Sequence, residues 1–291
     1  MRRSIGEKAF IAFNYVFLSL STIICVAPML YILMASFISP NEYLAHGISF
    51  PRRFSLYNYI YLLGVKNKVT RGLAINIYIT VVATALNVIF TFITAYVISK
   101  KYLLGVTKMT FFMYSTVLFS GGLIPFFLWM RFLGFSNSLW VLIVPGLITP
   151  GYCLLIRNYL VAIPASLEES AKIDGANDLV IMFQVIMPLS LPVVATIGLF
   201  YAVEHWNEWF NAMIFLSDSN KYPLQLVLRY FLVNRVMPVD PEQIRNRALV
   251  EVPSDILKMT AIVISMFPIL CAYPFVQKYF IKSIIAGSVK G

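Results

Sequence analysis

Residues 163–176 read IPASLEESAKIDGA, a polar stretch that lies between two hydrophobic runs of the chain. Pro164 favours the first turn of a helix, because the N–H that proline lacks has no partner there in any helix. Ser166 and Glu169 have the spacing of a capping box, in which each side chain bonds the backbone N–H of the other residue. Gly175 is typical of the left-handed residue that ends a helix. The stretch therefore predicts a short helix that ends at a glycine break.

The composition places this stretch in a membrane protein. The chain has 291 residues, of which 59% are hydrophobic and 12% are charged, whereas a soluble domain carries about 25% charged residues. The missing charge is concentrated in apolar runs, and about 20 apolar residues are enough for a helix to cross a bilayer. Such runs exclude a soluble protein built around one large core.

Six runs are long enough to cross the bilayer: residues 10–37, 72–99, 107–130, 138–160, 181–215 and 256–280. Each should be helical, because hydrocarbon offers unpaired backbone groups no partner. The first run is too long for the hydrophobic part of a signal peptide, so we expect it to be retained. The fold class that follows is all-α and polytopic, with six transmembrane helices.

We expect a single transmembrane domain over residues 1–291, with its core at about 72–281. The polar stretch belongs to a loop at 161–180 on one side of the membrane. Two long loops, at 38–71 and 216–255, lie on the other side. The second of these contains residues 224–231, which have the pattern of an amphipathic helix at the membrane interface.

The formal net charge of +10 does not indicate a nucleic-acid partner. Lysines and arginines gather beside the apolar runs, where they meet lipid headgroups and help to fix the topology. No motif of a nucleic-acid-binding fold interleaves them. Six spans place both termini on one side of the membrane, and the basic residues of the two sides are nearly equal in number.

From its residues alone, the stretch at 163–176 has two interpretations. Glu168 and Glu169 lie near the positive end of the helix dipole, which stabilises them. Ala171 would let another surface approach closely. The product is a short rigid helix with a face of small residues, suited to docking. The alternative is an ordinary surface linker, since capping patterns are common.

The stretch resembles the EAA loop of permease subunits in binding-protein-dependent ABC importers. In that family Glu-Ala-Ala is followed by three residues and a glycine, and here Glu169-Ser170-Ala171 precedes Lys172-Ile173-Asp174 and Gly175. Ser170 departs from the usual alanine but remains small. The resemblance extends to other segments, namely Asp174-Gly175-Ala176, Ile186-Met187-Pro188-Leu189, Ser120-Gly121-Gly122-Leu123-Ile124-Pro125, Tyr222-Pro223-Leu224-Gln225 and the tail from Gln277 to Gly291. Ser283 departs from the glycine that relatives often carry.

The chain is most similar to the smaller permease of the maltose-type carbohydrate importers, in the polysaccharide, alginate and oligosaccharide branch. This resemblance implies the type I permease fold, with residues 166–176 as a cytoplasmic coupling helix that an ATPase holds. The tail at 283–291 would lie at the ATPase dimer. The coupling residues would be Glu168, Glu169, Ser170, Ala171, Asp174, Gly175 and Ala176, and a hinge of the fifth span would lie at Pro188 and Pro192.

The resemblance also implies partners. These are a second, related permease, two ATPase subunits and an extracytoplasmic solute-binding protein, together with membrane lipid and a carbohydrate substrate. The ATPases would bind ATP and Mg²⁺, so this chain would hold no cofactor. It would lie in a bacterial cell membrane with both termini in the cytoplasm, where the ATP is. The resemblance does not identify the sugar.

A second group of polar residues lies in the fifth run: Glu204, Asn207, Glu208 and Asn211. Offsets of three, four and seven residues put all four on one helix face. Because a carboxylate within hydrocarbon is costly, such a face marks a translocation path that offers acceptors to sugar hydroxyls. Alternatively, this end of the helix has already reached the headgroups, as the nearby tryptophans would suit. His205 lies off the face and is expected to be an interfacial packing residue.

Two rival functions leave the EAA-like loop unexplained. A membrane enzyme acting on lipid-linked sugars would use Glu204 and Glu208 as acids. A self-sufficient secondary carrier often shows a repeated half, and no repeat is visible. The chain has no phosphate-binding G-x-x-x-x-G-K-[ST] loop, no G-x-S-x-G and no H-E-x-x-H, so neither a catalytic nor a metal site is expected.

Overall fold

A computed structural model describes residues 5–64, 67–100, 102–234 and 253–288. Within these ranges the chain forms helices and turns and contains no β-strand, which confirms the all-α expectation. The chain divides into two units, one formed by residues 1–70 and 230–267 and the other by 71–229 and 268–291. The expectation of a single domain over the whole chain stays a prediction.

The first unit begins with α1 (Ile5–Ser36), continues through α2 (Pro40–His46) and α3 (Tyr57–Leu62), and includes the start of α15 (Ser254–Ser288). The end of α1 is fixed by buried polar groups. Asn58 donates from Nδ2 to the carbonyls of Ser36 (3.1 Å) and Ile38 (2.8 Å). Thr260 of α15 donates to the same Ser36 carbonyl at 3.3 Å. These bonds occupy carbonyls that the end of a helix leaves without a partner.

Most of α1 packs against nothing in the described part of its own unit. Residues 6–36 are apolar and long enough to span a membrane, and none of their most hydrophobic window is buried. Exposed side chains continue around the helix, for example Phe13 (64%), Tyr15 (71%) and Ile24 (64%). Such a surface requires lipid or another protein around it.

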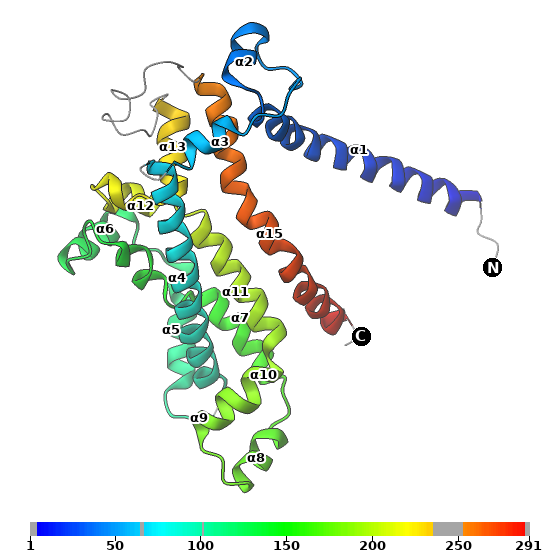
Figure 1. Cartoon of the computed structure of the whole chain (residues 1–291). Coiled ribbons are helices and arrows are strands. Elements are labelled where there is room, and N and C mark those ends of the chain that lie inside the picture. The colour runs from blue at the N-terminus through cyan, green and yellow to red at the C-terminus, as the bar shows by residue number, and fades with distance from the viewer. Residues whose placement is uncertain (1–4, 65–66, 101, 235–252, 289–291) are drawn as a thin grey trace. The chain divides into compact units, whose positions relative to one another are not determined.

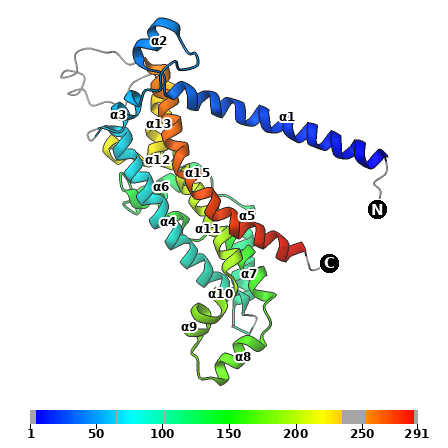
Figure 2. The same cartoon turned by 45° about the vertical axis from the view of Figure 1, so that its right-hand side comes forward.

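The second unit carries the remaining elements (Figure 1). They are α4 (Lys68–Ser99, starting in the first unit), α5 (Val106–Leu118), α6 (Leu123–Phe132), η1 (Leu139–Leu142), η2 (Val144–Gly146), α7 (Pro150–Val161), α8 (Ser166–Ile173), α9 (Asp178–Val180), η3 (Ile181–Ile186), α10 (Met187–Leu189), α11 (Leu191–Trp206), α12 (Phe210–Phe215), η4 (Ser219–Lys221) and α13 (Leu224–Asn234, ending in the first unit). Both views place α8 and α9 at one end of this unit, beyond α4, α7 and α11 (Figure 2).

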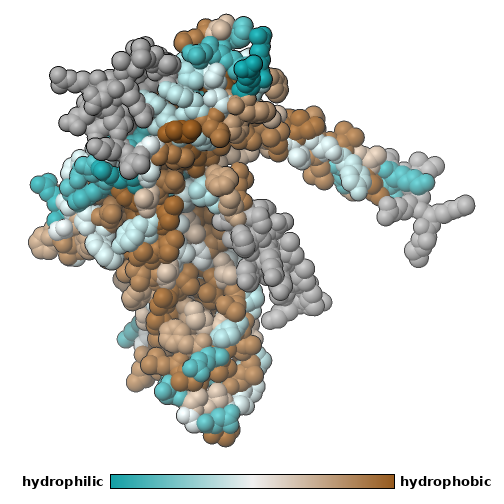
Figure 3. All heavy atoms as spheres, viewed as in Figure 1, coloured by the Kyte–Doolittle hydropathy of each residue, from teal (hydrophilic) through white to brown (hydrophobic). Residues whose placement is uncertain are grey.

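Two hydrophobic clusters hold the second unit together. The cluster nearer α8 joins α4, α5, α7, η3 and α11 through buried side chains such as Phe92, Ile156 and Ile197. The other joins α4, η1, α12 and α13 through side chains such as Ile79, Leu142 and Phe215. The outward surface of these helices is also apolar, whereas hydrophilic patches lie at the end that carries α8 and at the opposite end, near α12 (Figure 3). This distribution is typical of a membrane-spanning bundle with polar ends.

Within the described residues, three unbroken helices are long and apolar enough to cross a membrane: α1, α4 and the first part of α15. The three other predicted spans are pairs of helical segments bent by 119°, 40° and 84°. The described residues therefore contain up to six spans if each bent pair counts as one.

The predicted span over 107–130 is helical but sharply broken, because α5 and α6 meet at the 119° bend. The bend lies at Ser120-Gly121-Gly122. Gly122 has φ 84° and ψ 170°, a conformation that essentially only glycine adopts. The Ser120 hydroxyl accepts the Gly122 N–H at 3.3 Å, so the turn pairs one of its own backbone donors.

The predicted span over 181–215 is broken as well. Residues 178–189 and α11 meet at 84°, and α12 is a separate helix. Pro188 and Pro192 lie in the first turns of α10 and α11, where a missing N–H is tolerated. Each proline thus begins a helix instead of kinking one.

The predicted interfacial helix at 224–231 exists as α13, but it is largely internal. Leu224, Leu226 and Phe231 are fully buried, and Val227 and Leu228 are 4% exposed. Gly72 of α4 lets this helix approach closely, since a Cβ there would lie 3.3 Å from the Leu224 backbone. The apolar face of α13 packs against protein, so the expectation of an interfacial position is wrong.

We predict that Gly122→Ala destabilises the protein by about 1–3 kcal/mol, the cost of holding a side-chain-bearing residue in this backbone region. Only Pro125 Cδ, at 4.0 Å, lies near an added Cβ, so the cost is backbone strain and not a clash. Thermal unfolding in detergent would measure it. Gly121→Ala is the matched control, because a Cβ there meets nothing within 4 Å; equal melting temperatures for the two variants would contradict the prediction.

Candidate functional site

The short helix predicted from the polar stretch is α8, Ser166–Ile173. It starts one residue earlier than the capping pattern suggests, because Ala165 is the N-cap residue and makes no side-chain cap bond. Ser166 is therefore already inside the helix, and the expected capping box does not form. Glu168 and Glu169 lie in the first turn, where the helix dipole favours negative charge.

The glycine break is confirmed. Gly175 has φ +84°, and the N–H of Ala176 bonds the Ala171 carbonyl at 3.0 Å. The Gly175 N–H bonds the Lys172 carbonyl at 3.0 Å. This is the pattern by which a left-handed residue satisfies the last carbonyls of a helix. The chain can therefore turn sharply after α8 without leaving these carbonyls unpaired.

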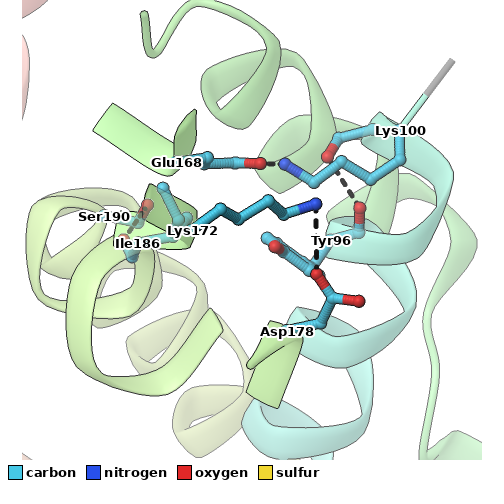
Figure 4. A network of polar contacts seen from close by, with 8 residues as sticks. Tyr96, Lys100, Glu168, Lys172, Asp178, Ile186 and Ser190 are labelled. Atoms are coloured by element: carbon cyan, nitrogen blue, oxygen red, sulfur yellow. Dashed lines mark hydrogen bonds and ion pairs between the residues drawn. The ribbon is translucent and has the colours of Figure 1, made fainter. Parts of the chain in front are cut away.

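One face of α8 points into its own unit. Glu168 pairs with Lys100, the residue directly after α4, and their side chains are 18% and 13% exposed. The Lys100 ammonium also lies 4.3 Å from the centre of the Tyr96 ring, and Figure 4 shows the three side chains gathered between α4 and α8. Ala171 and Ala176 pack against the hydrophobic cluster nearer α8. Three residues expected to meet a partner thus face inward.

The opposite face of α8 is open. Glu169, Ser170, Asp174 and Gly175 are exposed, as expected for a docking surface. Two apolar side chains that the sequence reasoning missed accompany them, Leu167 at 41% and Ile173 at 86% exposure. Exposed apolar side chains rimmed by polar ones are typical of an interaction site.

A second ion pair joins α8 to α9. Lys172 Nζ lies 3.4 Å from Asp178 Oδ1, and the side chains are 49% and 73% exposed. The hydrogen bond from Lys172 to Asp178 raises the pKa of the lysine above its ordinary value, so the ammonium stays charged at neutral pH. Water screens so exposed a pair. The Lys100–Glu168 pair is far less exposed, at 13% and 18%, so water screens its attraction less than that of Lys172–Asp178. Lys100–Glu168 is therefore the stronger of the two ion pairs.

A continuous helical path leads from α8 to α11. Asn177 caps α9 by accepting the Val180 N–H at 2.9 Å. The next segment, η3, is a π-helix, a wide helical turn that often marks functional sites. Ser190 is fully buried at the 84° bend, and its hydroxyl donates to the Ile186 carbonyl at 2.8 Å. The two candidate hinge prolines, Pro188 and Pro192, flank this serine.

The four polar residues of the predicted fifth span do not share a helix face, because α11 ends at Trp206. Asn207 follows it and donates to the Val203 carbonyl at 2.8 Å. Glu208 lies outside both helices and accepts the backbone and side-chain N–H groups of Asn211, each at 2.9 Å. Glu208 therefore anchors the start of α12. Glu204, exposed on α11, accepts a hydrogen bond from the Tyr152 hydroxyl of α7.

The sequence reasoning missed a buried polar seam between α4 and α11. Asn87 Nδ2 lies 3.0 Å from His205 Nε2, and Thr91 Oγ1 lies 2.7 Å from the Tyr201 hydroxyl. Asn76 donates to the Trp206 carbonyl at 3.2 Å. His205 is thus an internal residue, and the expected interfacial position is wrong. The signal available in the sequence was the spacing of polar residues at 76, 80, 84, 87 and 91, which marks one face of α4.

Neither the polar residues around α8 nor the polar seam between α4 and α11 has the ligand groups of a metal centre. In the part of the chain that the structure describes, no group of three or more His, Cys, Asp or Glu side chains is placed to hold a metal ion. The chemistry that the described residues offer is hydrogen bonding, charge pairing and docking.

Known proteins resemble the chain over nearly its whole length. It is 40% identical over 279 residues to the polygalacturonan/rhamnogalacturonan transport system permease protein YtcP of Bacillus subtilis (strain 168), covering 95% of this chain and 96% of that protein. It is 37% identical over 293 residues to protein LplC of the same organism, covering 100% and 98%.

A solved structure agrees with these similarities. A chain in the crystal structure of a bacterial ABC transporter involved in the import of the acidic polysaccharide alginate matches with a TM-score of 0.88 and 32% identity, over 96% of this chain and 99% of that one. No protein-family model matches the chain.

We predict that Tyr201→Phe destabilises the second unit by about 1–3 kcal/mol, the cost of leaving buried polar groups unpaired. Tyr201 is 1% exposed, and its hydroxyl accepts the Thr149 N–H at 3.0 Å as well as pairing with Thr91. Thermal unfolding in detergent would measure the loss. Tyr78→Phe on the exposed side of α4 (46% exposed) is the control, and equal losses would contradict the prediction.

Proposed function

The chain belongs to the permease subunits of carbohydrate ABC importers, and from that premise we propose that α8 is the surface through which it couples to an ATPase. The observation that carries this proposal is the open face of α8, where Leu167 and Ile173 are exposed among polar side chains at one end of the second unit. A permease of this family is not an enzyme, and separate ATPase subunits hydrolyse the ATP. The rival enzyme and carrier functions are thereby set aside.

The proposed docking surface differs from the set of residues expected from the sequence. Glu169, Ser170, Asp174 and Gly175 remain in it because they are exposed. Glu168, Ala171 and Ala176 hold α8 in place from its inner side. Leu167 and Ile173 join the surface, since apolar side chains at the centre of an interface contribute most of its binding energy.

An importer permease works with a second permease, an ATPase and a solute-binding protein. We propose the finer assembly of one second permease of related sequence, two ATPase subunits that bind ATP and Mg²⁺, and one extracytoplasmic binding protein. The open face of α8, with Leu167 and Ile173 exposed, supports an assembly larger than this chain.

The membrane position follows from the family and the apolar helices, and the cell membrane is the implied location. We propose that α8, both termini and the turn after α4 face the cytoplasm, where the ATPases are. The loops at 38–71 and 216–255 then face outward. The binding protein would meet the chain on that outer side.

Force on α8 would reach the membrane helices through α9, η3 and the bend at Ser190. We propose that Pro188 and Pro192 make this bend the hinge. Neither proline has an N–H that could join the helices on its two sides into one α-helix. Alternating access would follow, with ATP binding and hydrolysis changing the angle at which α11 leaves the bend.

Glu204 supports a translocation path along α11. Its carboxylate is exposed in a span-forming helix and bonds the Tyr152 hydroxyl, and an ionisable group in such a helix usually faces a bundle interior or water. We propose that Glu204 and Asn207 line the path. Glu208 and Asn211 have a structural part in this proposal, because they start α12.

For the substrate we propose an acidic poly- or oligosaccharide. The support is that one relative is described by its transport of polygalacturonan and rhamnogalacturonan, and that the matching structure imports an acidic polysaccharide. The carbohydrate class itself follows from the family.

We predict that Gly175→Asp uncouples ATP hydrolysis from transport without unfolding the subunit. An added Cβ meets nothing within 4 Å, and aspartate tolerates a positive φ better than most residues, so the change places a charge on the docking surface. The measurements are recovery of the ATPase with the tagged permease, and ATP hydrolysis with and without the binding protein.

Gly134→Asp is the matched control for this variant. Gly134 has φ +80° and equally open space around its Cβ position, but it lies in the turn after α6. Both variants should melt alike, and only Gly175→Asp should lose coupling. Normal uptake by Gly175→Asp, with the ATPase recovered as in the wild type, would refute the docking surface.

We predict that Glu204→Ala lowers uptake of a uronate trisaccharide by tenfold or more, while the ATPase is still recovered with the permease. The reason is that the change removes a path-lining acceptor far from α8. Glu208→Ala, the comparison, should lower the melting temperature because α12 loses its anchor. Unchanged uptake by Glu204→Ala would remove Glu204 from the path.

A further inference from the structure

Lys100 connects α8 to the membrane helices by a route other than the chain itself. The covalent route runs from α8 through α9, η3 and the bend at Ser190 to α11. The second route is the ion pair between Glu168 of α8 and Lys100 at the end of α4. Figure 4 shows both in one view, with the Glu168–Lys100 pair on one side and the Ser190–Ile186 bond on the other.

This ion pair is sheltered from water. The side chains of Lys100 and Glu168 are 13% and 18% exposed, and the ring of Tyr96 lies 4.3 Å from the ammonium. A sheltered pair is screened little by dissolved salt, whereas the exposed Lys172–Asp178 pair is screened strongly. Of the two ion pairs that α8 makes within the described residues, only Lys100–Glu168 reaches the end of a membrane-spanning helix, α4.

The end of α4 is held firmly enough to transmit a displacement. Ile98 and Ala95 are fully buried in the cluster nearer α8. Arg157 of α7 donates from Nε to the Ile98 carbonyl at 3.3 Å, which satisfies a carbonyl at the helix terminus. A movement imposed on Lys100 would therefore move the end of α4, and not only a flexible side chain.

We propose that Lys100 is a positioning residue for coupling: through Glu168 it orients α8 for the ATPase and passes the displacement of α8 directly to α4. The proposal rests on the proposed function of α8. In this proposal α8 is connected to α11 by the backbone and to α4 by the Glu168–Lys100 ion pair. A displacement of α8 then acts on both helices that enclose the polar seam.

Two simpler roles are possible for Lys100. It is a basic residue beside a span, where lysine contributes to membrane topology. It also stabilises the fold of the second unit, as any sheltered ion pair does. Both roles require only that the pair and a basic residue on this side of the membrane are kept. Neither role predicts that a fully assembled complex responds differently to the binding protein.

The test uses the whole purified importer complex in proteoliposomes, with Lys100→Met, Glu168→Gln, Lys100→Arg and the charge-exchanged double variant Lys100→Glu/Glu168→Lys. The readouts are the amount of ATPase recovered with the permease and the stimulation of ATP hydrolysis by the binding protein loaded with a uronate trisaccharide. Lys108→Met, an exposed lysine on α5, is the matched control.

We expect Lys100→Met and Glu168→Gln to lower the stimulation at least fivefold while the ATPase is still recovered. Lys100→Arg and the charge-exchanged variant should restore most of it, and Lys108→Met should leave it unchanged. Unchanged stimulation in Lys100→Met would overturn the proposal. So would a charge-exchanged variant as impaired as either single change while its melting temperature and membrane insertion match the wild type.

If the proposed function of α8 is itself wrong, the same experiment gives a different result. If α8 is not the docking surface, Ile173→Asp leaves ATPase recovery and stimulation at wild-type values. If α8 docks but Lys100 has no part in coupling, Ile173→Asp loses the ATPase while Lys100→Met behaves like Lys108→Met. The two results separate the two claims.

Discussion

Hydrogen bonding of the backbone within hydrocarbon is the constraint on which the rest of this structure depends. A group left unpaired in the bilayer costs several kcal/mol, so each hydrophobic run must be helical wherever it is continuous. The runs also break, and each break supplies its own partners. The Ser120 hydroxyl accepts the Gly122 N–H, the Ser190 hydroxyl donates to the Ile186 carbonyl, and Glu208 accepts the backbone N–H of Asn211 in the first turn of α12. These breaks are where the bundle changes direction.

The features that depend on periodicity and composition were predictable from the sequence. The helical class, the positions of the hydrophobic runs, the short helix at 166–173 and its end at Gly175 follow from local preferences that no distant contact overrides. The breaks inside runs were harder to predict. Gly122 and Pro192 are visible in the sequence, but whether a proline kinks a helix or begins a new one depends on what packs around it. The assumed helix through Asn207 placed four residues on one face that the end of α11 separates.

The short helix at 166–173 was predicted in place, but the face that it turns inward was not. A pattern on a short helix identifies which residues lie together, but it does not say which face meets the subunit's own core. That is decided by Lys100, 68 residues before Glu168 in the chain, and long-range pairs of this kind leave no local signal. The buried seam of Asn87, Thr91 and His205 did leave one, in the regular spacing of polar residues along α4. That spacing indicates a buried seam only if polar residues in a membrane helix are considered as partners in internal packing.

The π-helix at 181–186 sets the rotational phase between α8 and α11. A π-turn accommodates one residue more than the α-helical turn it replaces, and each α-helical residue turns the chain by about 100°. Removing that extra residue would rotate everything before it, α8 included, by roughly that angle about the helix axis. The open face of α8 would then no longer point away from its own unit. Which surface α8 presents is therefore fixed by the number of residues between it and the bend as much as by the residues on α8 itself.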